Sequence, residues 1–250
     1  MIDSGIGGLS VLLEVRRLLP EQAIIYLGDS AHCPYGTKST SAIQDRCLTL
    51  CDYLVAQGAT LIIVACNSAT IAAVEMLRAE YPVPIIGMEP AVKPAARLSQ
   101  SGVIGVLATE ASLAGEKFHR LVSRHARGLR VIKTPCPRFV RLVESGTLTG
   151  PEAEGAIRAY TAPMLAAKAD VLILGCTHYP FLLPLMRQLI PEPVKILETG
   201  SAVARRTLDL LEDPQPGPVT LLTSGSADLW TRILPLLCPH LRATVSSFTG

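Results

Sequence analysis

The amino-acid sequence predicts an α/β fold of two similar domains, each a mostly parallel β-sheet flanked by helices, and three observations support this prediction. Short apolar runs rich in Ile and Val recur along the chain. Amphipathic stretches with helical spacing separate these runs. One pattern, an apolar run that ends in Cys and polar residues, occurs twice. Continuous apolar strands that alternate with helices are typical of parallel sheets covered on both faces.

The expected strands are short runs dominated by Ile, Val and Leu. Branched apolar side chains pack well on a pleated surface, whereas Gly, Pro and Asp at the ends of a run favour turns. In chain order, the expected strands span residues 23–27, 60–65, 84–87, 103–108, 130–133, 171–175, 194–197 and 219–223.

The expected helices lie between these strands and repeat apolar residues at a spacing of three or four, which places them on one helix face. They span residues 8–19, 41–57, 69–80, 112–123, 152–167 and 199–211. The Pro-rich stretch 213–218 is expected to form a turn before the last strand of the chain.

The repeated pattern aligns residues 59–68 with residues 169–178 and puts Cys66 and Cys176 at equivalent positions. Their separation of 110 positions (176 − 66) is close to the length of one α/β domain. Ligands of open α/β sheets bind at the carboxyl ends of the strands. Two such domains facing each other would place both thiols in one interdomain cleft.

The composition excludes several classes of protein. Apolar residues make up 49% and charged residues 18%, which excludes a disordered chain. The net charge of +2 and the aromatic content of 4% argue against a nucleic-acid partner. No apolar run approaches the ~20 residues of a membrane span, and no secretory signal is recognisable. We therefore expect a cytoplasmic protein without a membrane partner.

The seven cysteines include no C-x-x-C pair, so their spacing fits neither a disulfide framework nor a zinc site. We expect no metal. A buried Cys is usually a small apolar filler, and this reading stays open for every cysteine. Cys66 and Cys176 differ because each stands where an apolar strand gives way to a polar loop. His178 lies two residues after Cys176, within reach of tuning a thiol.

Three further segments carry candidate residues. The Gly-rich residues 3–9 form either an anion-binding turn at a helix N-terminus or a tight turn that merely needs glycine. Pro34-Tyr35-Gly36 lies in a loop and fits a plain turn as well as a binding loop. Glu144 is expected at a helix end, as a surface carboxylate or as part of a site.

Taken together, these segments resemble the cofactor-independent aspartate/glutamate racemase superfamily and, within it, the glutamate racemases. Their order and spacing match across nearly the whole chain. Ser68 stands where the family usually has Thr, and His32 and Cys33 replace more usual basic and apolar residues. The matching motifs are Asp3-Ser-Gly-Ile-Gly-Gly-Leu9, Gly28-Asp-Ser30, Pro34-Tyr-Gly36, Val64-Ala-Cys-Asn-Ser-Ala-Thr70, Gly87-Met-Glu-Pro90, Gly105-Val-Leu-Ala-Thr109, Leu142-Val-Glu-Ser-Gly146 and Leu174-Gly-Cys-Thr-His-Tyr-Pro180.

The resemblance implies a role for each candidate. Cys66 and Cys176 correspond to the two catalytic thiols, the first acting on the D-substrate and the second on the L-substrate. Asp3 corresponds to the carboxylate that assists Cys66, His178 to the assistant of Cys176, and Glu144 to a further auxiliary. The positions that match the amino-acid binding residues are Asp3, Ser4, Tyr35, Gly36, Asn67, Ser68, Thr177 and His178.

The resemblance also implies the wider biochemistry. The first domain would comprise residues 1–91 plus 200–250, and the second, inserted domain residues 92–199. The expected substrate is glutamate, racemised without a cofactor by a homodimer in the cytoplasm, and the D-glutamate formed would supply peptidoglycan biosynthesis and hence cell shape.

Two thiols suit this chemistry because racemisation removes a proton from one face of Cα and returns one to the other. An ordinary Cys has a pKa of about 8.5, close enough to neutrality to act as thiol or thiolate. Three alternatives remain open: an aspartate racemase or related two-cysteine isomerase, a cysteine hydrolase using Cys176 and His178, and a non-catalytic binding protein.

Overall fold

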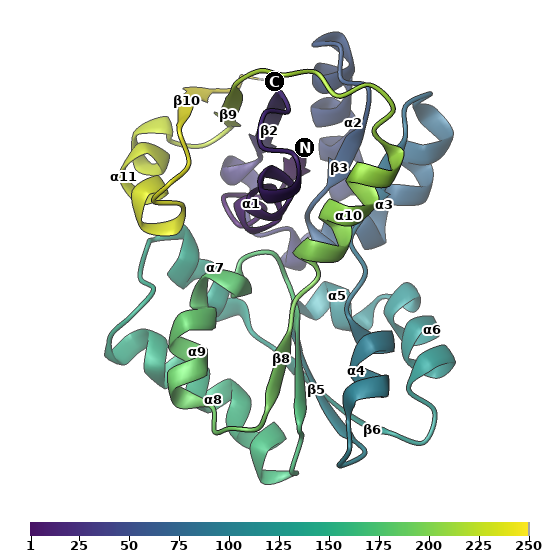
Figure 1. Ribbon diagram of the computed structural model, residues 1–250, viewed down its shortest axis with the longest axis vertical. Helices are drawn as coiled ribbons and strands as arrows, with labels where there is room; N and C mark the ends of the chain where they lie inside the picture. The colour runs from purple at the N-terminus through teal and green to yellow at the C-terminus, as the bar shows by residue number, and fades with distance from the viewer. Residues whose placement is uncertain (250) are drawn as a thin grey trace. The chain divides into compact units, whose positions relative to one another are not determined.

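The computed structural model describes residues 1–249 and divides into two compact units (Figure 1). Unit 1 consists of Met1–Met88 and the chain from Gly200 onward, and unit 2 consists of Glu89–Thr199. Each unit contains its own sheet and its own helices. The predicted fold class, parallel sheets flanked by helices, is confirmed.

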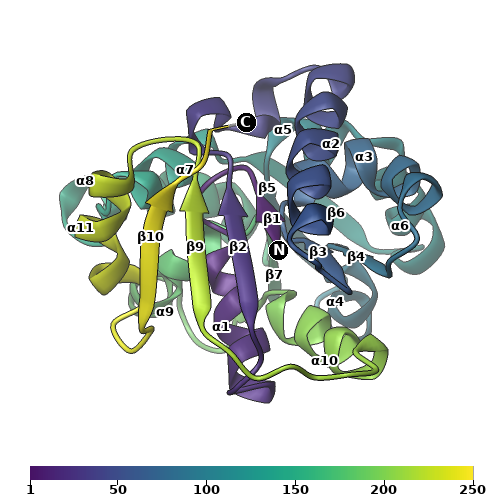
Figure 2. The same cartoon turned by 90° about the horizontal axis from the view of Figure 1, so that it is seen from above.

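Unit 1 is built on a six-stranded sheet in the order β10-β9-β2-β1-β3-β4, in which every pair is parallel. Figure 2 shows β10, β9 and β2 side by side, although the first two come from the end of the chain. The strands are β1 (Ile2–Asp3), β2 (Ile24–Gly28), β3 (Ile62–Val64), β4 (Ile85–Gly87), β9 (Val219–Thr223) and β10 (Ala243–Ser247).

The helices of unit 1 pack in pairs, α1 against α10 and α2 against α3. Apolar residues of α2 and α3, such as Leu50 and Leu77, are buried in one cluster with Ile62 and Val64 of β3. Burying such side chains stabilises the layers by about 1.5–3 kcal/mol each. The elements are α1 (Leu9–Leu18), α2 (Thr40–Ala56), α3 (Asn67–Glu80), α10 (Gly200–Leu210), α11 (Ala227–Leu237) and the short 3₁₀ helices η1 (Ser30–His32) and η2 (Tyr35–Thr37).

Unit 2 contains a four-stranded parallel sheet in the order β6-β5-β7-β8. Its strands are β5 (Val103–Ala108), β6 (Arg130–Pro135), β7 (Val171–Gly175) and β8 (Lys195–Leu197). Its helices are α4 (Val92–Leu98), α5 (Glu110–Ala114), α6 (Glu116–His125), α7 (Pro137–Glu144), α8 (Pro151–Ala166), the 3₁₀ helix η3 (Tyr179–Leu182) and α9 (Leu183–Leu189).

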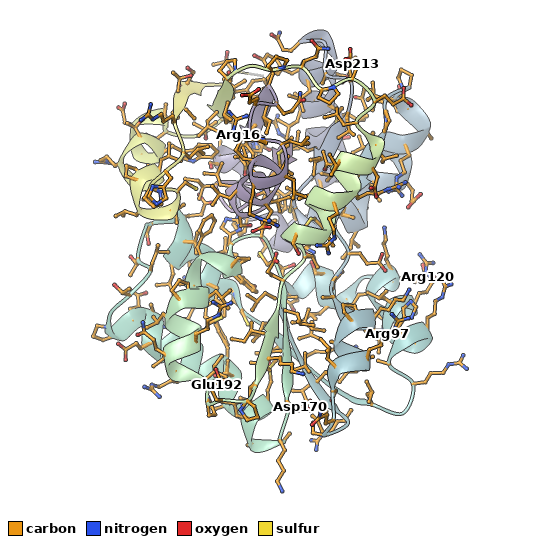
Figure 3. The ribbon with its side chains drawn as sticks, viewed as in Figure 1. Arg16, Arg97, Arg120, Asp170, Glu192 and Asp213 are labelled. Atoms are coloured by element: carbon orange, nitrogen blue, oxygen red, sulfur yellow. The ribbon has the colours of Figure 1, made fainter. Side chains whose placement is uncertain are left out.

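A carboxylate fixes the amino end of the central strand β7 in unit 2. Asp170, labelled in Figure 3, accepts hydrogen bonds from Ser99 Oγ at 2.6 Å and from the backbone N–H groups of Gln100 and Ser101 at 2.6 and 2.8 Å. Desolvation would raise the pKa of Asp170, but these hydrogen bonds lower it to about 2. The loop before β5 is thereby tied to β7, which ends at Gly175, directly before Cys176.

Each of the eight expected strands overlaps an observed strand. Residues 219–223 do form a strand, β9, but the prediction that it is the last strand of the chain was wrong. The chain continues to β10, whose Ala-Thr-Val-Ser-Ser sequence is polar and largely exposed because it lies at the sheet edge. Four helices, α4, α7, α9 and α11, have no counterpart among the helix ranges expected from the sequence, although a helix end was expected at Glu144 of α7. Pro94, Pro137 and Pro184 lie in the first turns of α4, α7 and α9, where proline is tolerated, whereas Pro235 lies inside α11.

Within residues 1–249, the structure holds no helix that is both long and apolar enough to cross a bilayer.

Candidate functional site

Three strands of unit 1 bring the first group of candidate residues to one edge of the sheet. The parallel register places Asp3 beside Gly28 and Ile2 beside Val64. Because parallel strands end at the same edge, Asp3 at the end of β1, Asp29 just after β2 and Cys66 shortly after β3 lie along that edge. The sequence prediction for the location of Cys66, at a strand end before a helix, agrees with this arrangement.

The Cys66 thiol is 6% exposed and occupies the N-cap position of α3. It accepts a hydrogen bond from the Ala69 backbone N–H at 3.4 Å and donates to the Ser4 hydroxyl at 3.7 Å. Asp3 is 1% exposed, and its Oδ1 accepts from the Gly5 backbone N–H at 3.0 Å. A thiolate at Cys66 would be favoured by the partial positive charge at the N-terminus of α3.

Asn67, the first residue of α3, is 3% exposed. Neither its Nδ2 nor its Oδ1 has a hydrogen-bond partner among residues 1–249. Leaving a buried amide unpaired costs about 1–3 kcal/mol per group, so native structures seldom keep one without a reason. Ser68, next to it, is also buried. This amide is therefore available to a bound ligand.

Asp29, directly after β2, is fully buried and accepts hydrogen bonds through both oxygens. Oδ1 receives Ser224 Oγ at 2.7 Å, Arg46 Nη2 at 2.9 Å and His32 Nδ1 at 3.0 Å. Oδ2 receives the Tyr35 hydroxyl at 2.6 Å and Arg46 Nε at 2.9 Å. Burial acts to raise the pKa of Asp29, but these donors, Arg46 foremost, lower it to about 2.

Tyr35 is 1% exposed, and its hydroxyl proton is committed to Asp29. Burial, followed by the charge of Asp29, raises the pKa of Tyr35 far above its usual value. The phenol therefore remains protonated and does not act as a base. Tyr35 and Gly36 belong to η2, which packs against α3.

Unit 2 presents the second thiol in the same way, at the carboxyl end of β7. Cys176, Thr177 and His178 follow that strand and are 8%, 3% and 1% exposed. Cys176 Sγ lies 3.7 Å from His178 Nδ1, and His178 Nε2 lies 2.7 Å from Glu144 Oε1. Glu144 ends α7, as expected from the sequence, and its side chain is 21% exposed. The carboxylate thus orients the imidazole toward the thiol.

Tyr179 is a neighbour of this group that the sequence analysis did not single out. Its hydroxyl donates to the Cys136 carbonyl at 3.1 Å, and its ring packs edge-on against Phe139. Burial, then the charge of Cys176, raises the pKa of Tyr179 well above its usual value. Tyr179 therefore remains a neutral packing residue next to Cys176. In the sequence, the Tyr-Pro pair after His178 is the signal that could have pointed to it.

Four other cysteines are buried, in agreement with the hypothesis that they pack as small apolar side chains. Burial raises the pKa of Cys51 and of Cys238 to about 12, and the pKa values of Cys47 and Cys136 are raised further. Thiols with such pKa values stay protonated at neutral pH and react slowly. Cys47 and Cys51 form the apolar stripe on α2 that their spacing predicts.

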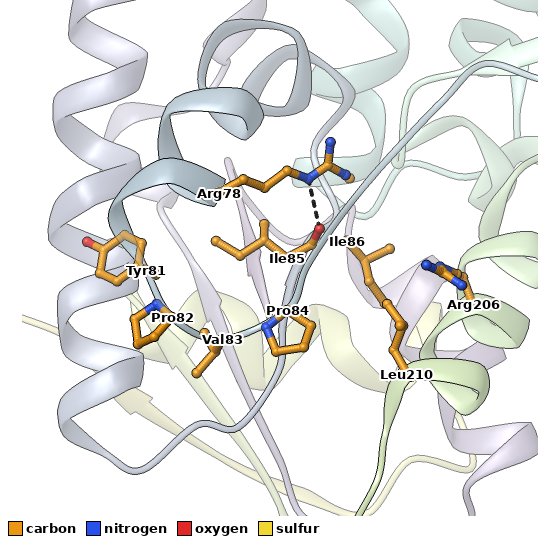
Figure 4. Close-up of a pocket in the computed structure, with 10 residues that line it drawn as sticks. Arg78, Tyr81, Pro82, Val83, Pro84, Ile85, Ile86, Arg206 and Leu210 are labelled. Carbon is orange, nitrogen blue, oxygen red and sulfur yellow. Dashed lines mark hydrogen bonds between the residues drawn. The ribbon is translucent and has the colours of Figure 1, made fainter.

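A cavity of about 570 Å³ in unit 1 contains none of the candidate residues. It lies between the segment that joins α3 to β4 and the helix α10, and Arg78 and Arg206 extend along its walls (Figure 4). Arg78 Nε donates to the Ile85 carbonyl at 3.2 Å. Because the cavity lacks a nucleophile or a base, the candidate chemistry remains at the carboxyl ends of the strands.

Comparison with known proteins identifies the class. The model of the Asp/Glu/Hydantoin racemase family matches residues 10–207, and the chain belongs to this family. A glutamate racemase of Ectopseudomonas mendocina is 48% identical over 244 residues, which cover 95% of this chain and 93% of that protein.

Solved structures agree. The Escherichia coli glutamate racemase, in complex with L-glutamate and the activator UDP-MurNAc-Ala, superposes with a TM-score of 0.90 at 32% identity and covers 99% and 96% of the two chains. The Bacillus anthracis glutamate racemase isoform RacE1 gives a TM-score of 0.87 at 27% identity, with coverage of 99% and 96%. The resemblance of the motifs to glutamate racemases is thereby confirmed, and the chain groups with these isomerases.

Proposed function

We propose that this protein interconverts L-glutamate and D-glutamate without a cofactor, with Cys66 and Cys176 as the two bases. One observation carries the proposal: in a chain of this racemase family, β3 and β7 are each followed within two residues by a buried Cys with polar partners. The similarity to relatives named glutamate racemase supports glutamate, rather than another amino acid, as the substrate.

The proposed reaction needs one thiolate and one thiol. The thiolate removes the Cα proton from one face of the substrate, and the electron pair delocalises into the carboxylate as an enolate-like intermediate. The other thiol then delivers its proton to the opposite face. The two sulfur atoms have exchanged protonation states, so the return reaction starts from the product of the forward one.

On the Cys66 side, Asp3 is the proposed assistant, and the Ser4 hydroxyl accepts a hydrogen bond from the thiol in the resting arrangement. On the Cys176 side, the Glu144 carboxylate holds the His178 imidazole, whose Nδ1 faces the sulfur. An imidazole in this position can take the thiol proton or return it, which is the task of an assisting base.

Substrate binding is assigned to side-chain hydroxyls, the unpaired side-chain amide of Asn67 and backbone N–H groups. Asn67 would donate to a substrate carboxylate, and the enolate-like charge would be stabilised by such preorganised donors. The remaining proposed contacts come from Asp3, Ser4, Tyr35, Gly36, Ser68, Thr177 and His178. Given the commitment of the Tyr35 hydroxyl to Asp29, the contact from Tyr35 is assigned to its backbone.

The wider role follows from the product. D-Glutamate formed by this reaction would enter peptidoglycan biosynthesis in the cytoplasm and so support cell-wall biogenesis and cell shape. The enzyme is proposed to act as a homodimer.

Circular dichroism of L-glutamate incubated with purified protein, with no added cofactor, tests the proposal. The optical signal should decay to zero, because the enantiomers have equal free energy in water. Cys66→Ser and Cys176→Ser should each abolish the decay, whereas Cys238→Ala, which removes a buried thiol outside the site, should leave it intact. A stable signal with the unaltered protein would overturn the assignment. Decay with L-aspartate but not with L-glutamate would favour an aspartate racemase instead.

A second candidate, a cysteine hydrolase, is favoured by the Cys176–His178–Glu144 arrangement alone. A nucleophile, a base and an orienting carboxylate define that mechanism as well. Mass spectrometry distinguishes the two, because a hydrolase forms an acyl adduct on Cys176 with an activated ester and leaves L-glutamate unchanged.

A further inference from the structure

The C-terminal segment of unit 1 reaches the site loops through one small side chain. The parallel register of β9 with β2 places Thr223 opposite Gly28. Ser224 is therefore held beside Asp29 by the sheet itself, and its backbone N–H donates to the Gly28 carbonyl at 3.1 Å. Residues separated by almost two hundred positions become neighbours in this way.

Ser224 uses its hydroxyl twice. It donates to Asp29 Oδ1 at 2.7 Å and accepts from the Ala31 backbone N–H at 3.1 Å. The hydroxyl thus bridges the carboxylate and the first turn of η1. An alanine at this position would break both hydrogen bonds while leaving the backbone register of β9 and β2 in place.

Trp230 makes a second connection from the same segment. Its indole N–H donates to Ser30 Oγ at 3.1 Å. Its ring lies so close to Gly28 that a Cβ atom there would approach the ring to 2.4 Å. Gly28, Asp29, Ser30 and Ala31 therefore all contact side chains that the chain supplies after β9.

Asp29 in turn fixes the loop that carries Tyr35 and Gly36. The Tyr35 hydroxyl donates to Oδ2 at 2.6 Å, and Arg46 of α2 donates to both carboxylate oxygens. Tyr35 shares one buried cluster with Cys66, so a rotation of the Asp29 carboxylate would displace the loop next to the first thiol.

We propose that Ser224 is a positioning residue for the racemisation: acting through Asp29, it fixes the Tyr35–Gly36 loop in its ligand-binding position. This inference rests on the proposed function. Ser224 itself is not required to touch the substrate. Because the loop would hold the substrate equally in the ground state and the transition state, its loosening should weaken binding rather than slow the chemical step.

The test compares three single variants with the unaltered enzyme by steady-state kinetics on both glutamate enantiomers. Ser224→Ala removes the hydroxyl, and Ser224→Thr restores it. The matched control is Ser226→Ala, two residues further on. Its hydroxyl accepts only a capping hydrogen bond from the Leu229 backbone N–H at 3.2 Å among the described contacts, and the residue is exposed.

Ser224→Ala should raise the KM for both enantiomers about five-fold, which corresponds to about 1 kcal/mol, with kcat nearly unchanged. Because the equilibrium constant is one, kcat/KM must fall equally in the two directions. Ser224→Thr should restore KM to within about two-fold of the original, and Ser226→Ala should leave KM unaltered even if the melting temperature falls.

Three outcomes would overturn the inference: an unaltered KM in Ser224→Ala, a Ser224→Thr variant as impaired as Ser224→Ala, or an equal rise in KM in Ser226→Ala. If Ser224→Ala does not fold, Trp230→Phe provides the second measurement. This variant removes the indole N–H that donates to Ser30 together with part of the ring that lies against Gly28, so KM should rise and kcat should not. An unaltered protein without glutamate turnover would instead refute the proposed function.

Discussion

Asn67 should cost the protein stability in the absence of ligand, and replacing it with Leu, a residue of similar shape, should reveal that cost. Both polar atoms of the Asn67 amide are buried without a partner among residues 1–249. At about 1–3 kcal/mol for each unpaired group, Asn67→Leu should raise the free energy of unfolding of the ligand-free protein by about 2 kcal/mol. The gain is placed near the lower limit because the new methyl groups must fit the same space.

Urea unfolding without and with glutamate measures the stability of the ligand-free protein and the stabilisation that bound glutamate adds. The unaltered protein should gain about 2.7 kcal/mol at a glutamate concentration of 100 Kd, whereas Asn67→Leu should gain almost nothing. Thr70→Val on the same helix is the control. Its hydroxyl donates to the Val64 carbonyl at 3.1 Å and accepts from the Met88 N–H at 2.9 Å, so its loss should destabilise the protein.

The reasoning would be refuted if Asn67→Leu destabilised the ligand-free protein as Thr70→Val does. It would also be refuted if Asn67→Leu kept the full stabilisation by glutamate. The first result would mean that the amide is satisfied in the folded protein, and the second that it does not contact the ligand.

Three other predictions concern charge and close packing. The pKa of Asp29 is lowered from 3.8 to about 2 in the folded protein, so Asp29→Asn should lower the free energy of unfolding at pH 7 by about 2 kcal/mol. In urea titrations, the difference between the two proteins should shrink as the pH falls from about 4 toward 2, where the carboxyl becomes protonated. A difference that stays constant with pH would contradict this prediction. Glu144→Gln keeps a hydrogen-bond acceptor for His178 but loses the charge, so kcat/KM should fall about ten-fold in both directions with little change in melting temperature; unaltered kinetics would remove Glu144 from the mechanism. Gly28→Ala would place a Cβ 2.4 Å from the Trp230 ring and 2.5 Å from the Gly5 carbonyl oxygen, so it should lower the free energy of unfolding by about 3 kcal/mol. The control is Gly155→Ala in α8, where a Cβ meets open space. Chemical denaturation should show that this control is neutral or stabilising.

The sequence was most informative where one strand and its following loop decide the outcome. Cys66 and Cys176 were located correctly at strand ends because continuous apolar runs followed by polar residues define the end of a buried parallel strand. The helix end at Glu144 was predicted for a similar local reason.

Contacts that depend on tertiary structure could not be predicted in this way. Glu144 and His178 pair although they lie 34 residues apart in the sequence, and the local pattern around either residue does not indicate its partner. The donors to Asp29 come from three separate segments, and Ser224 is 195 residues away. The edge strand β10 has neither apolar run nor alternation strong enough to stand out, because it lies at the border of the sheet.

The order of strands in unit 1 has a consequence for synthesis on the ribosome. The inserted unit 2 is complete before β9 leaves the ribosome, whereas β2 must wait for β9 to cover its open side. Until then β2 is an unprotected edge, the kind of surface on which nascent chains aggregate. A nascent chain that has emerged beyond residue 199 but not yet to residue 219 should therefore hold a half-finished first unit that depends on chaperones, beside a second unit that can already fold.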